Sequence, residues 1–398
     1  MGNSLKAIEL KAGREKSVRN RHPWIFSGAV NKYTGELGNG ETVKVFSSSG
    51  EALGYAAYSA QSQIRARMWT WDANQEINTG FFMDRIAEAL QLRKNLIPES
   101  ETDAVRLINA ESDGLPGLIV DRYADHLVMQ VLSAGMEYWR ETITDLLPDL
   151  TGIANLYERS DVEVRLLEGL PERCSSILGD ASQKPVRIHE NGLQFQVDLV
   201  GGQKTGFFID QRKNRLFLRN LAKGKRVLDC FCYSGGFTVS ALAGDARHVV
   251  AVDSSQDALN HAMENVRINA MDENKVDWIA ADVFKELRLM RDKNEKFDMI
   301  ILDPPKFAPT IKQVERASRG YKDINLLAFK LLNPGGTLIT FSCSGGVSED
   351  LFQKIVFGSA LDAGVNARII ARLHQGVDHP VSLNFPEGAY LKGLVCHI

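Results

Sequence analysis

Several features of membrane and secreted proteins are missing from this sequence of 398 residues. No uninterrupted apolar run approaches the ~20 residues of a membrane span, which argues against a membrane protein. Residues 1–16 mix charged and polar side chains and contain no apolar stretch of the kind found in secretion signals. The five cysteines are odd in number and lack the spacing of a disulfide framework, which favours a reducing compartment. We therefore expect a cytoplasmic protein.

A strong charge of one sign is also lacking. The net charge of −3 argues weakly against a nucleic-acid partner. The charges are unevenly distributed, however, since residues 1–70 contain ten Lys and Arg against five Glu. Such a basic segment is a candidate footprint for a phosphate backbone, and an ordinary solvated surface is the open alternative.

What the sequence does contain is typical of a globular protein of two or three domains. It has 44% hydrophobic and 24% charged residues, and domains commonly span roughly 100–200 residues. The type of secondary structure that the sequence predicts changes twice along the chain. We predict a β-rich domain over residues 1–75, a small α+β domain over 76–185 and an α/β domain over 186–398.

Residues 1–75 read as short strands separated by turns, and a basic, aromatic run lies between the first two. Alternation predicts strands over residues 5–10, 41–46, 53–58 and 64–71. Arginine suits phosphate and aromatic rings suit stacking on RNA bases. An open alternative is that Trp24 and Phe26 are core residues of a small barrel. The candidate RNA-binding residues are Arg19, Arg21, His22, Trp24, Arg65 and Arg67.

The run Arg21-His22-Pro23-Trp24-Ile25-Phe26-Ser27-Gly28 resembles part of the PUA domain. This small RNA-binding module is shared by pseudouridine synthases and archaeosine transglycosylases. The run looks like the form of the module found in one group of methyltransferases. The resemblance implies that residues 1–75 form a PUA-like barrel that binds RNA.

Residues 76–185 mix helical and strand patterns. We predict a helix over 81–96, a turn at residues 111–117, and a linker over 168–185, which contains Pro171, Gly179 and Pro185. The cluster at residues 157–161 reads as a loop with internal salt bridges. The remaining predicted elements are strands over 105–110, 118–123, 126–132 and 153–159 and a helix over 138–147.

From residue 226 onward strands alternate with helices, and an acidic or thiol group stands at or just past the end of each strand. In an open parallel sheet these ends face a single crevice, so we predict one site. The tail is expected to add two antiparallel strands, over 367–373 and 390–396, because the loop between them is too short for a crossover helix. The strand-end groups are Asp229, Asp253, Asp282, Asp303 and Cys343.

The turn at residues 227–236 is typical of a strand that ends at a nucleoside cofactor, with Gly235 near the start of a helix. The Gly-x-Gly-x-x-Gly spacing of dinucleotide dehydrogenases is absent. Here the chain resembles the class I methyltransferases that use S-adenosylmethionine. The resemblance implies a Rossmann-like α/β fold, with a seven-stranded, mostly parallel sheet and an antiparallel terminal strand. Phe231 and Tyr233 stand where that class commonly has glycines.

The resemblance to class I methyltransferases implies roles for several of these residues. Asp253 would hold the ribose of the cofactor and Asp282 would approach the adenine amine. The segment Asp303-Pro304-Pro305-Lys306 would face the target base. Asp229, Phe231, Tyr233 and Gly235 belong to the first cofactor loop. No metal ion is expected.

Cys343 follows a strand at this edge and lies beside a Ser-Gly-Gly turn. A cysteine is by default a small buried apolar residue. Here an accessible thiolate could add to carbon 6 of a pyrimidine and make carbon 5 nucleophilic enough to accept a methyl group. Such a thiol needs a lowered pKa, for which Lys306 is a candidate neighbour.

From end to end the chain is similar to the bacterial 23S ribosomal RNA 5-methylcytosine methyltransferases. The resemblance implies 23S ribosomal RNA, or a partly assembled large subunit, as the partner, and leaves a homodimer open. It is carried by the segments Arg21-His22-Pro23-Trp24, Glu111-Ser112-Asp113-Gly114-Leu115-Pro116-Gly117, Lys204-Thr205-Gly206, Asp210-Gln211-Arg212, Asp303-Pro304-Pro305-Lys306-Phe307 and Phe341-Ser342-Cys343-Ser344.

Two segments change their interpretation with this resemblance. By itself Asp210-Gln211-Arg212 reads as helix capping, whereas the family implies a place near the cofactor. Many RNA 5-methylcytosine enzymes have a second cysteine where this chain has Lys306, so another group must remove the carbon 5 proton, with Asp303 a candidate. The alternatives are a base N-methyltransferase and a non-catalytic RNA-binding or assembly factor.

Overall fold

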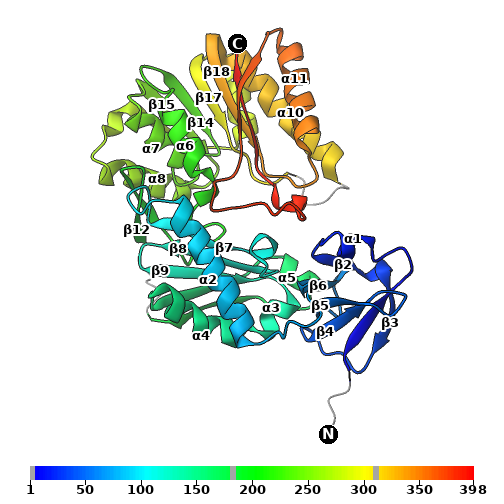
Figure 1. Ribbon diagram of the computed structural model, residues 1–398. Coiled ribbons are helices and arrows are strands. Elements are labelled where there is room, and N and C mark those ends of the chain that lie inside the picture. The colour runs from blue at the N-terminus through cyan, green and yellow to red at the C-terminus, as the bar shows by residue number, and fades with distance from the viewer. Residues whose placement is uncertain (1–4, 180–184, 308–312) are drawn as a thin grey trace. The chain divides into compact units, whose positions relative to one another are not determined.

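The computed structural model describes residues 5–179, 185–307 and 313–398 (Figure 1). The chain forms two compact units, each assembled from separate stretches of sequence. The first unit contains residues 1–189, 197–209 and 377–388, and the second contains 190–196, 210–376 and 389–398. The domain boundaries at residues 75 and 185 stay a prediction. None of the helices in the described ranges has the length and apolarity that crossing a membrane requires.

The first unit begins with a six-stranded sheet in the order β2-β6-β5-β4-β1-β3. The four strands predicted here are confirmed, and β2 and β3 are additional. Alternate side chains of the sheet pack into one apolar cluster that includes Ile8, Val43 and Met68. Its elements are β1 (Ala7–Leu10), α1 (Lys16–Arg19), β2 (Trp24–Phe26), η1 (Ser27–Ala29), β3 (Val30–Thr34), β4 (Thr42–Phe46), β5 (Ala52–Tyr58) and β6 (Ile64–Thr70).

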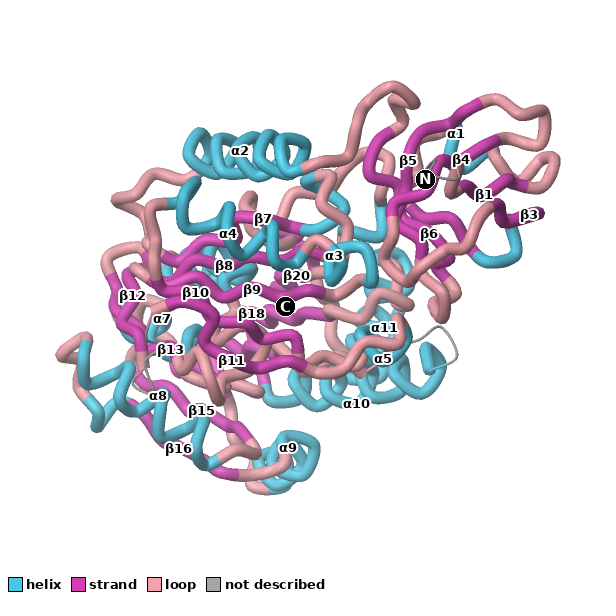
Figure 2. Tube along the Cα trace, turned by 90° about the horizontal axis from the view of Figure 1, so that it is seen from below, coloured by secondary structure: helices cyan, strands magenta, loops and turns pink. Residues whose placement is uncertain are grey.

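A five-stranded sheet in the order β11-β10-β9-β8-β7 follows in the same unit. Helices α2 and α4 pack against each other and against this sheet (Figure 2). The elements are α2 (Thr79–Leu96), β7 (Ala104–Asn109), η2 (Ala110–Asp113), β8 (Leu118–Tyr123), β9 (His126–Val131), α3 (Ala134–Tyr138), α4 (Arg140–Thr151), β10 (Asn155–Ser160), α5 (Val164–Leu167) and β11 (Arg173–Leu178).

Two predictions for this region are wrong in part. The expected linker over 168–185 contains β11, an edge strand that pairs with β10 and whose side chains are mostly exposed. Because neither face of this strand is buried, its sequence has no apolar alternation from which a strand could be predicted. The polar cluster at 157–161 lies largely in β10, although the ion pair of Arg159 with Asp161 is present. The helix expected over 138–147 is confirmed as α4, which begins at Arg140 and continues to Thr151, and the short helix α3 precedes it.

The turn at residues 111–117 connects several parts of the first unit. Glu111 accepts a hydrogen bond from Trp24 Nε1 at 2.8 Å, which ties the turn to the six-stranded sheet. Asp113 accepts two hydrogen bonds, both of 2.7 Å, from the buried guanidinium of Arg93 in α2. Ser112 Oγ accepts from the backbone N–H of Ser382 at 3.3 Å. This motif therefore has structural partners within the first unit.

A hairpin of β12 (Val186–Glu190) and β13 (Leu193–Val197) leads to the seven-stranded sheet of the second unit, whose order is β16-β15-β14-β17-β18-β20-β19. β20 runs antiparallel to both neighbours, as predicted for the tail. The unit contains η3 (Ile209–Gln211), α6 (Arg212–Arg219), β14 (Arg226–Cys230), α7 (Gly236–Ala243), β15 (His248–Asp253), α8 (Gln256–Ile268), η4 (Glu273–Lys275), β16 (Val276–Ala280), α9 (Val283–Asp292), β17 (Phe297–Leu302), α10 (Val314–Leu331), β18 (Leu332–Ser342), α11 (Glu349–Ala363), β19 (Arg368–Leu373) and β20 (Lys392–His397).

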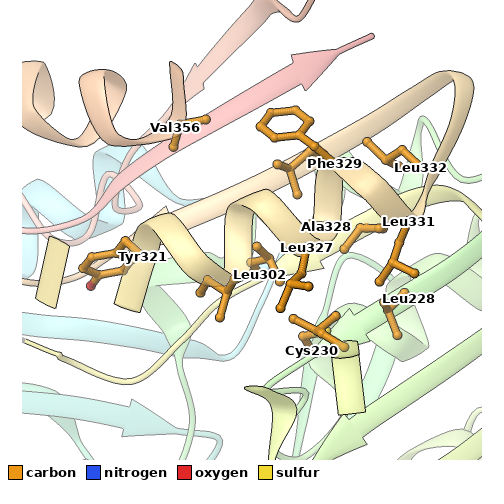
Figure 3. Close-up of a cluster of buried hydrophobic side chains, with 14 of the residues drawn as sticks. Leu228, Cys230, Leu302, Tyr321, Leu327, Ala328, Phe329, Leu331, Leu332 and Val356 are labelled. Atoms are coloured by element: carbon orange, nitrogen blue, oxygen red, sulfur yellow. The ribbon is translucent and has the colours of Figure 1, made fainter. Parts of the chain in front are cut away.

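Helices cover both faces of this sheet, which is why its central strands are continuously apolar. Leu228 of β14 faces α9, α10 and α11, whereas its neighbour Val227 faces α6, α7 and α8. Figure 3 shows the first of these clusters, in which Leu327 and Tyr321 of α10 pack over the strands. The result is a three-layer α/β fold that confirms the predicted fold class.

Replacing Leu327 with Ala should lower the free energy of unfolding by about 2–5 kcal/mol, because the side chain is 3% exposed and its loss leaves a cavity. Alanine is a good helix former, so the helix itself is not weakened. Leu361→Ala is the matched control in α11, since Leu361 is 65% exposed. Chemical denaturation measures both, and equal effects of the two substitutions would contradict this account of the core.

Candidate active site

The parallel strands of the second unit end at one edge of the sheet. Strands β14, β15, β16, β17 and β18 are mutually parallel neighbours. Asp253 is the last residue of β15, Asp303 directly follows β17, and Cys343 directly follows β18. Asp229 is the penultimate residue of β14, and Asp282 stands two residues past β16. The five strand-end groups singled out in the sequence therefore lie along the same edge.

In the turn after β14, every second residue adopts a left-handed backbone conformation. Phe231 has φ 62°, Tyr233 has φ 47° and Gly235 has φ 77°. The resemblance to class I methyltransferases implies glycine at the first two positions, and here Phe231 and Tyr233 adopt the left-handed conformation that glycine favours. Left-handed conformations of non-glycine residues cost of order 1–3 kcal/mol each. The ring of Phe231 packs edge-on against Phe284 with 6.5 Å between centroids, which helps to offset this strain.

Asp253 holds this turn in place. Its Oδ2 accepts from the backbone N–H of Tyr233 at 2.9 Å, and its Oδ1 accepts from the N–H of Ser255 at 2.9 Å. A carboxylate has further lone pairs, so the same oxygens can accept from ribose hydroxyls. Asp282 caps α9 by accepting from the N–H of Lys285 at 3.0 Å. The cofactor roles of both residues stay predictions.

Asp229 is buried and keeps one oxygen without a hydrogen bond. Its Oδ2 accepts from the Thr238 hydroxyl at 2.6 Å, whereas Oδ1 has no partner. Burial raises the pKa of Asp229 to about 7, the hydrogen bond from Thr238 opposes the rise, and the charge of Asp303 adds to it. An orphaned buried carboxylate oxygen fits a cationic donor such as the ammonium group of S-adenosylmethionine. The residues of this turn therefore suit the cofactor that the sequence implies.

The segment 210–212 leads into α6, and Gln211 at the N-cap position makes no side-chain capping hydrogen bond. Gln211 Nε2 instead donates to Asp303 Oδ2 at 3.0 Å, and Asn214 Nδ2 donates to Gln211 Oε1 at 2.6 Å. Asp210 Oδ2 accepts from the Tyr390 hydroxyl at 2.6 Å. The capping interpretation is therefore wrong, because the polar atoms point toward β17 and the C-terminal segment. Arg212 is completely buried.

Two residues near Cys343 were not found by sequence reasoning. Lys392 opens β20 opposite Ser342, and its Nζ donates to the carbonyl of Ser344 at 2.8 Å. The Tyr321 hydroxyl and Ser344 Oγ share a hydrogen bond of 3.0 Å. A lone lysine at the start of an otherwise apolar strand was the signal that could have drawn attention to Lys392. Lys306, the predicted neighbour of the thiol, is exposed.

The candidate RNA-binding residues of the first unit have mixed environments. Arg67 is buried and its Nη1 donates to Glu168 at 2.8 Å. This side chain therefore stabilises the fold and is not exposed to RNA. Trp24 packs against Phe385 with 4.8 Å between ring centroids. Arg19 is exposed and paired with Glu51.

The other three candidate RNA-binding residues are His22, Arg65 and Arg21. His22 Nε2 lies 3.3 Å from Glu387. Arg65 donates to the carbonyl of Ser59 at 2.8 Å, and Arg21 is exposed with φ 62°. An aromatic ring not among the candidates, that of Phe26, is 51% exposed.

Replacing Asp229 with Asn should stabilise the ligand-free protein increasingly as pH rises. The folded state keeps the Asp229 proton up to about pH 7, whereas an unfolded aspartate releases it near pH 4. The wild type therefore loses stability from this group between about pH 4 and 7, and asparagine does not titrate. The gain should reach up to about 4 kcal/mol. Calorimetric unfolding across pH measures it, and a difference between the two proteins that does not change with pH would contradict the assignment.

The comparisons with known proteins agree with this geometry. Residues 168–378 match the family model of S-adenosylmethionine-dependent methyltransferases, and residues 8–71 match a PUA-like domain. The chain is 51% identical over 390 residues to ribosomal RNA large subunit methyltransferase I of Aeromonas hydrophila, with 98% of each chain covered. It is 49% identical over 391 residues to the protein of the same name from Cronobacter sakazakii, covering 98% of this chain and 99% of that one.

The fold is also seen in solved structures. A methyltransferase crystallised in complex with SAH is 22% identical, with a TM-score of 0.86 over 98% of this chain and 100% of that one. A structure from Streptococcus mutans described as a SAM-dependent methyltransferase has a TM-score of 0.85 at the same identity and coverage. With a matched family model and relatives near half identity over the full length, the chain belongs to the S-adenosylmethionine-dependent methyltransferases, in the family of ribosomal RNA large subunit methyltransferase I.

Proposed function

We propose that this protein methylates large-subunit ribosomal RNA at carbon 5 of a cytosine, with Cys343 as the nucleophile. The names of its close relatives support the class of RNA. The position of Cys343 carries the chemistry, because a half-buried thiol follows β18 directly and Asp303 follows the adjacent parallel strand β17. The other cysteines of the second unit, Cys230, Cys232 and Cys396, are buried.

The proposed reaction begins when the Cys343 thiolate adds to carbon 6 of the cytosine and forms an S–C6 bond. The electron pair of the C5=C6 double bond then makes carbon 5 nucleophilic. S-adenosylmethionine supplies the electrophilic methyl group. Loss of the carbon 5 proton restores the double bond and expels Cys343 as a thiolate. The chain must therefore provide a thiolate on one side of the base and a proton acceptor near carbon 5.

Asp303 is the proposed proton acceptor. The amide of Gln211 donates to its Oδ2 at 3.0 Å, which fixes the orientation of the carboxyl group. Asn214 orients that amide, because its Nδ2 donates to Gln211 Oε1 at 2.6 Å and to the carbonyl of His374 at 3.1 Å. The family segment 210–212 thus acts, in this proposal, by positioning the carboxylate that faces the base.

A base N-methyltransferase is the main alternative, because an aromatic residue after Asp-Pro-Pro is common in those enzymes. In this chain Lys306 intervenes, and the aromatic residue is Phe307. Its ring packs against Tyr321 with 4.8 Å between centroids and against Phe284 at 5.8 Å. A ring used in this internal cluster is poorly placed to stack on a substrate base, which favours the carbon 5 reaction.

The PUA-like domain is proposed to hold the RNA. Residues 1–70 carry the local excess of positive charge, and several of the cations, including Arg14, Lys16 and Arg21, are exposed. Phe26 adds an exposed ring at the end of β2, where an unpaired base could stack. A cytoplasmic location, a partly assembled large subunit as substrate and a homodimer remain predictions.

Replacing Cys343 with Ala should abolish methylation while S-adenosylmethionine binding stays unchanged, because the thiol has no proposed part in holding the cofactor. Mass-spectrometric mapping of 23S ribosomal RNA, from cells without the protein and cells complemented with each variant, measures the modification. We expect a 5-methylcytosine that is absent without the protein and restored by the wild type but not by Cys343→Ala.

Cys174→Ala is the control, since Cys174 is an exposed cysteine of the first unit and should be dispensable. Full activity of Cys343→Ala would refute the thiol mechanism, and an N-methylated base would support the alternative. An unchanged modification profile together with no binding of S-adenosylmethionine by calorimetry would point to a non-catalytic RNA-binding factor.

Replacing Phe26 with Ala should weaken binding of the RNA substrate by about 1–3 kcal/mol, the typical contribution of one stacked base. Tyr33→Ala is the matched control, because Tyr33 is 45% exposed but lies in β3 at the opposite edge of the same sheet. Filter binding or fluorescence anisotropy with substrate RNA compares the two. Equal loss in both variants, or none in Phe26→Ala, would argue against a specific stacking role.

A further inference from the structure

We propose that Lys392, rather than Lys306, is the cation that stabilises the thiolate of Cys343, as a positioning residue buried beneath the reacting edge of the sheet. This inference rests on the proposed role of Cys343 and deepens it.

The strand pairing brings the two residues together. β18 and β20 are antiparallel, and Ser342 is directly opposite Lys392 in the register. Cys343 is the next residue after Ser342. Lys392 Nζ donates to the backbone carbonyl of Ser344 at 2.8 Å. The lysine side chain therefore extends from opposite Ser342 to Ser344, the two residues that flank Cys343. An ammonium has three N–H donors, and one is used in this bond.

The burial of Lys392 is costly and calls for a compensating anion. The residue is 6% exposed, and lysine is rarely buried without a partner. Burial lowers the pKa of Lys392, while a negative charge on Cys343 or Glu349 raises it and the charge of Lys306 lowers it. The same attraction must act in reverse on the thiol, because the interaction of two charges is mutual. A thiolate at Cys343 therefore stabilises the buried ammonium, and the ammonium lowers the pKa of the thiol.

Lys306 is less suited to this task. It is exposed on the loop after β17, where solvent screens its charge. Lys392 has the hydrogen bond to Ser344, and Tyr321 anchors the same serine through its hydroxyl at 3.0 Å. Two contacts thus fix the backbone that follows Cys343 relative to the buried charge.

Alkylation of Cys343 by iodoacetamide across pH, measured by mass spectrometry of its peptide, tests the proposal without any methyl transfer. In the wild type the rate should report a thiol pKa below the ordinary value of about 8.5. Lys392→Met should raise this pKa by about one unit or more, which corresponds to about tenfold slower alkylation near neutral pH. Lys392→Arg should keep the pKa low, and Lys306→Met should change it little.

Cys174 in the same digests is the internal reference, since it is exposed in the first unit and its alkylation should be the same in every variant. A pH profile of Cys343 that is unchanged in folded Lys392→Met would overturn the proposal. If that variant does not fold, the wild-type measurement decides, because a Cys343 pKa at or above about 8.5 is incompatible with a stabilised thiolate. Active Cys343→Ala with a Lys392-dependent thiol pKa would refute the methylation mechanism alone.

Discussion

The site depends on parallel pairing of β14, β15, β16, β17 and β18, which forces the carboxyl ends of five strands to one edge. Parallel strands need crossover helices, and here these cover both faces and bury a continuous apolar sheet. The polar groups that end the strands are thereby the natural lining of one edge. Residues separated by more than a hundred positions, such as Asp229 and Cys343, lie at the same edge because each stands at the carboxyl end of a parallel strand.

This edge of the sheet carries backbone strain and a buried carboxylate oxygen without a hydrogen bond. Phe231 and Tyr233 adopt left-handed backbone conformations, and Asp229 keeps a buried oxygen without a hydrogen bond. Each feature costs stability in the ligand-free protein, and a cationic, donor-rich cofactor would relieve at least the last. The surrounding core, including the contact of Phe231 with Phe284, holds the turn in this conformation. A cost in stability of this kind is what a preorganised binding site, as predicted for this turn, would require.

Buried side chains also explain why several family motifs are polar. In the first unit the carboxylates of the turn at residues 111–117 accept hydrogen bonds from Arg93 and Trp24, which are far apart in the sequence. In the second unit Gln211 is directed to Asp303 by Asn214. These hydrogen-bonded pairs favour this fold over others, because removing one partner leaves a buried polar atom of the other without a hydrogen bond. The motifs are therefore partly structural and partly, as proposed, catalytic.

Sequence patterns determined the α/β class, the strand ends with Asp253, Asp303 and Cys343, and the antiparallel tail, because apolar periodicity and loop length are local properties. The tertiary structure decided what lies beside those residues. Pairing of β20 with β18 brings Lys392 to Cys343 from the far end of the chain, and packing turns Arg67 inward to Glu168 and leaves Phe26 exposed. The edge strand β11 was not predicted because its side chains are mostly exposed and its sequence therefore lacks apolar alternation. Contacts between distant segments are set by register and burial, and these exist only once the chain has folded.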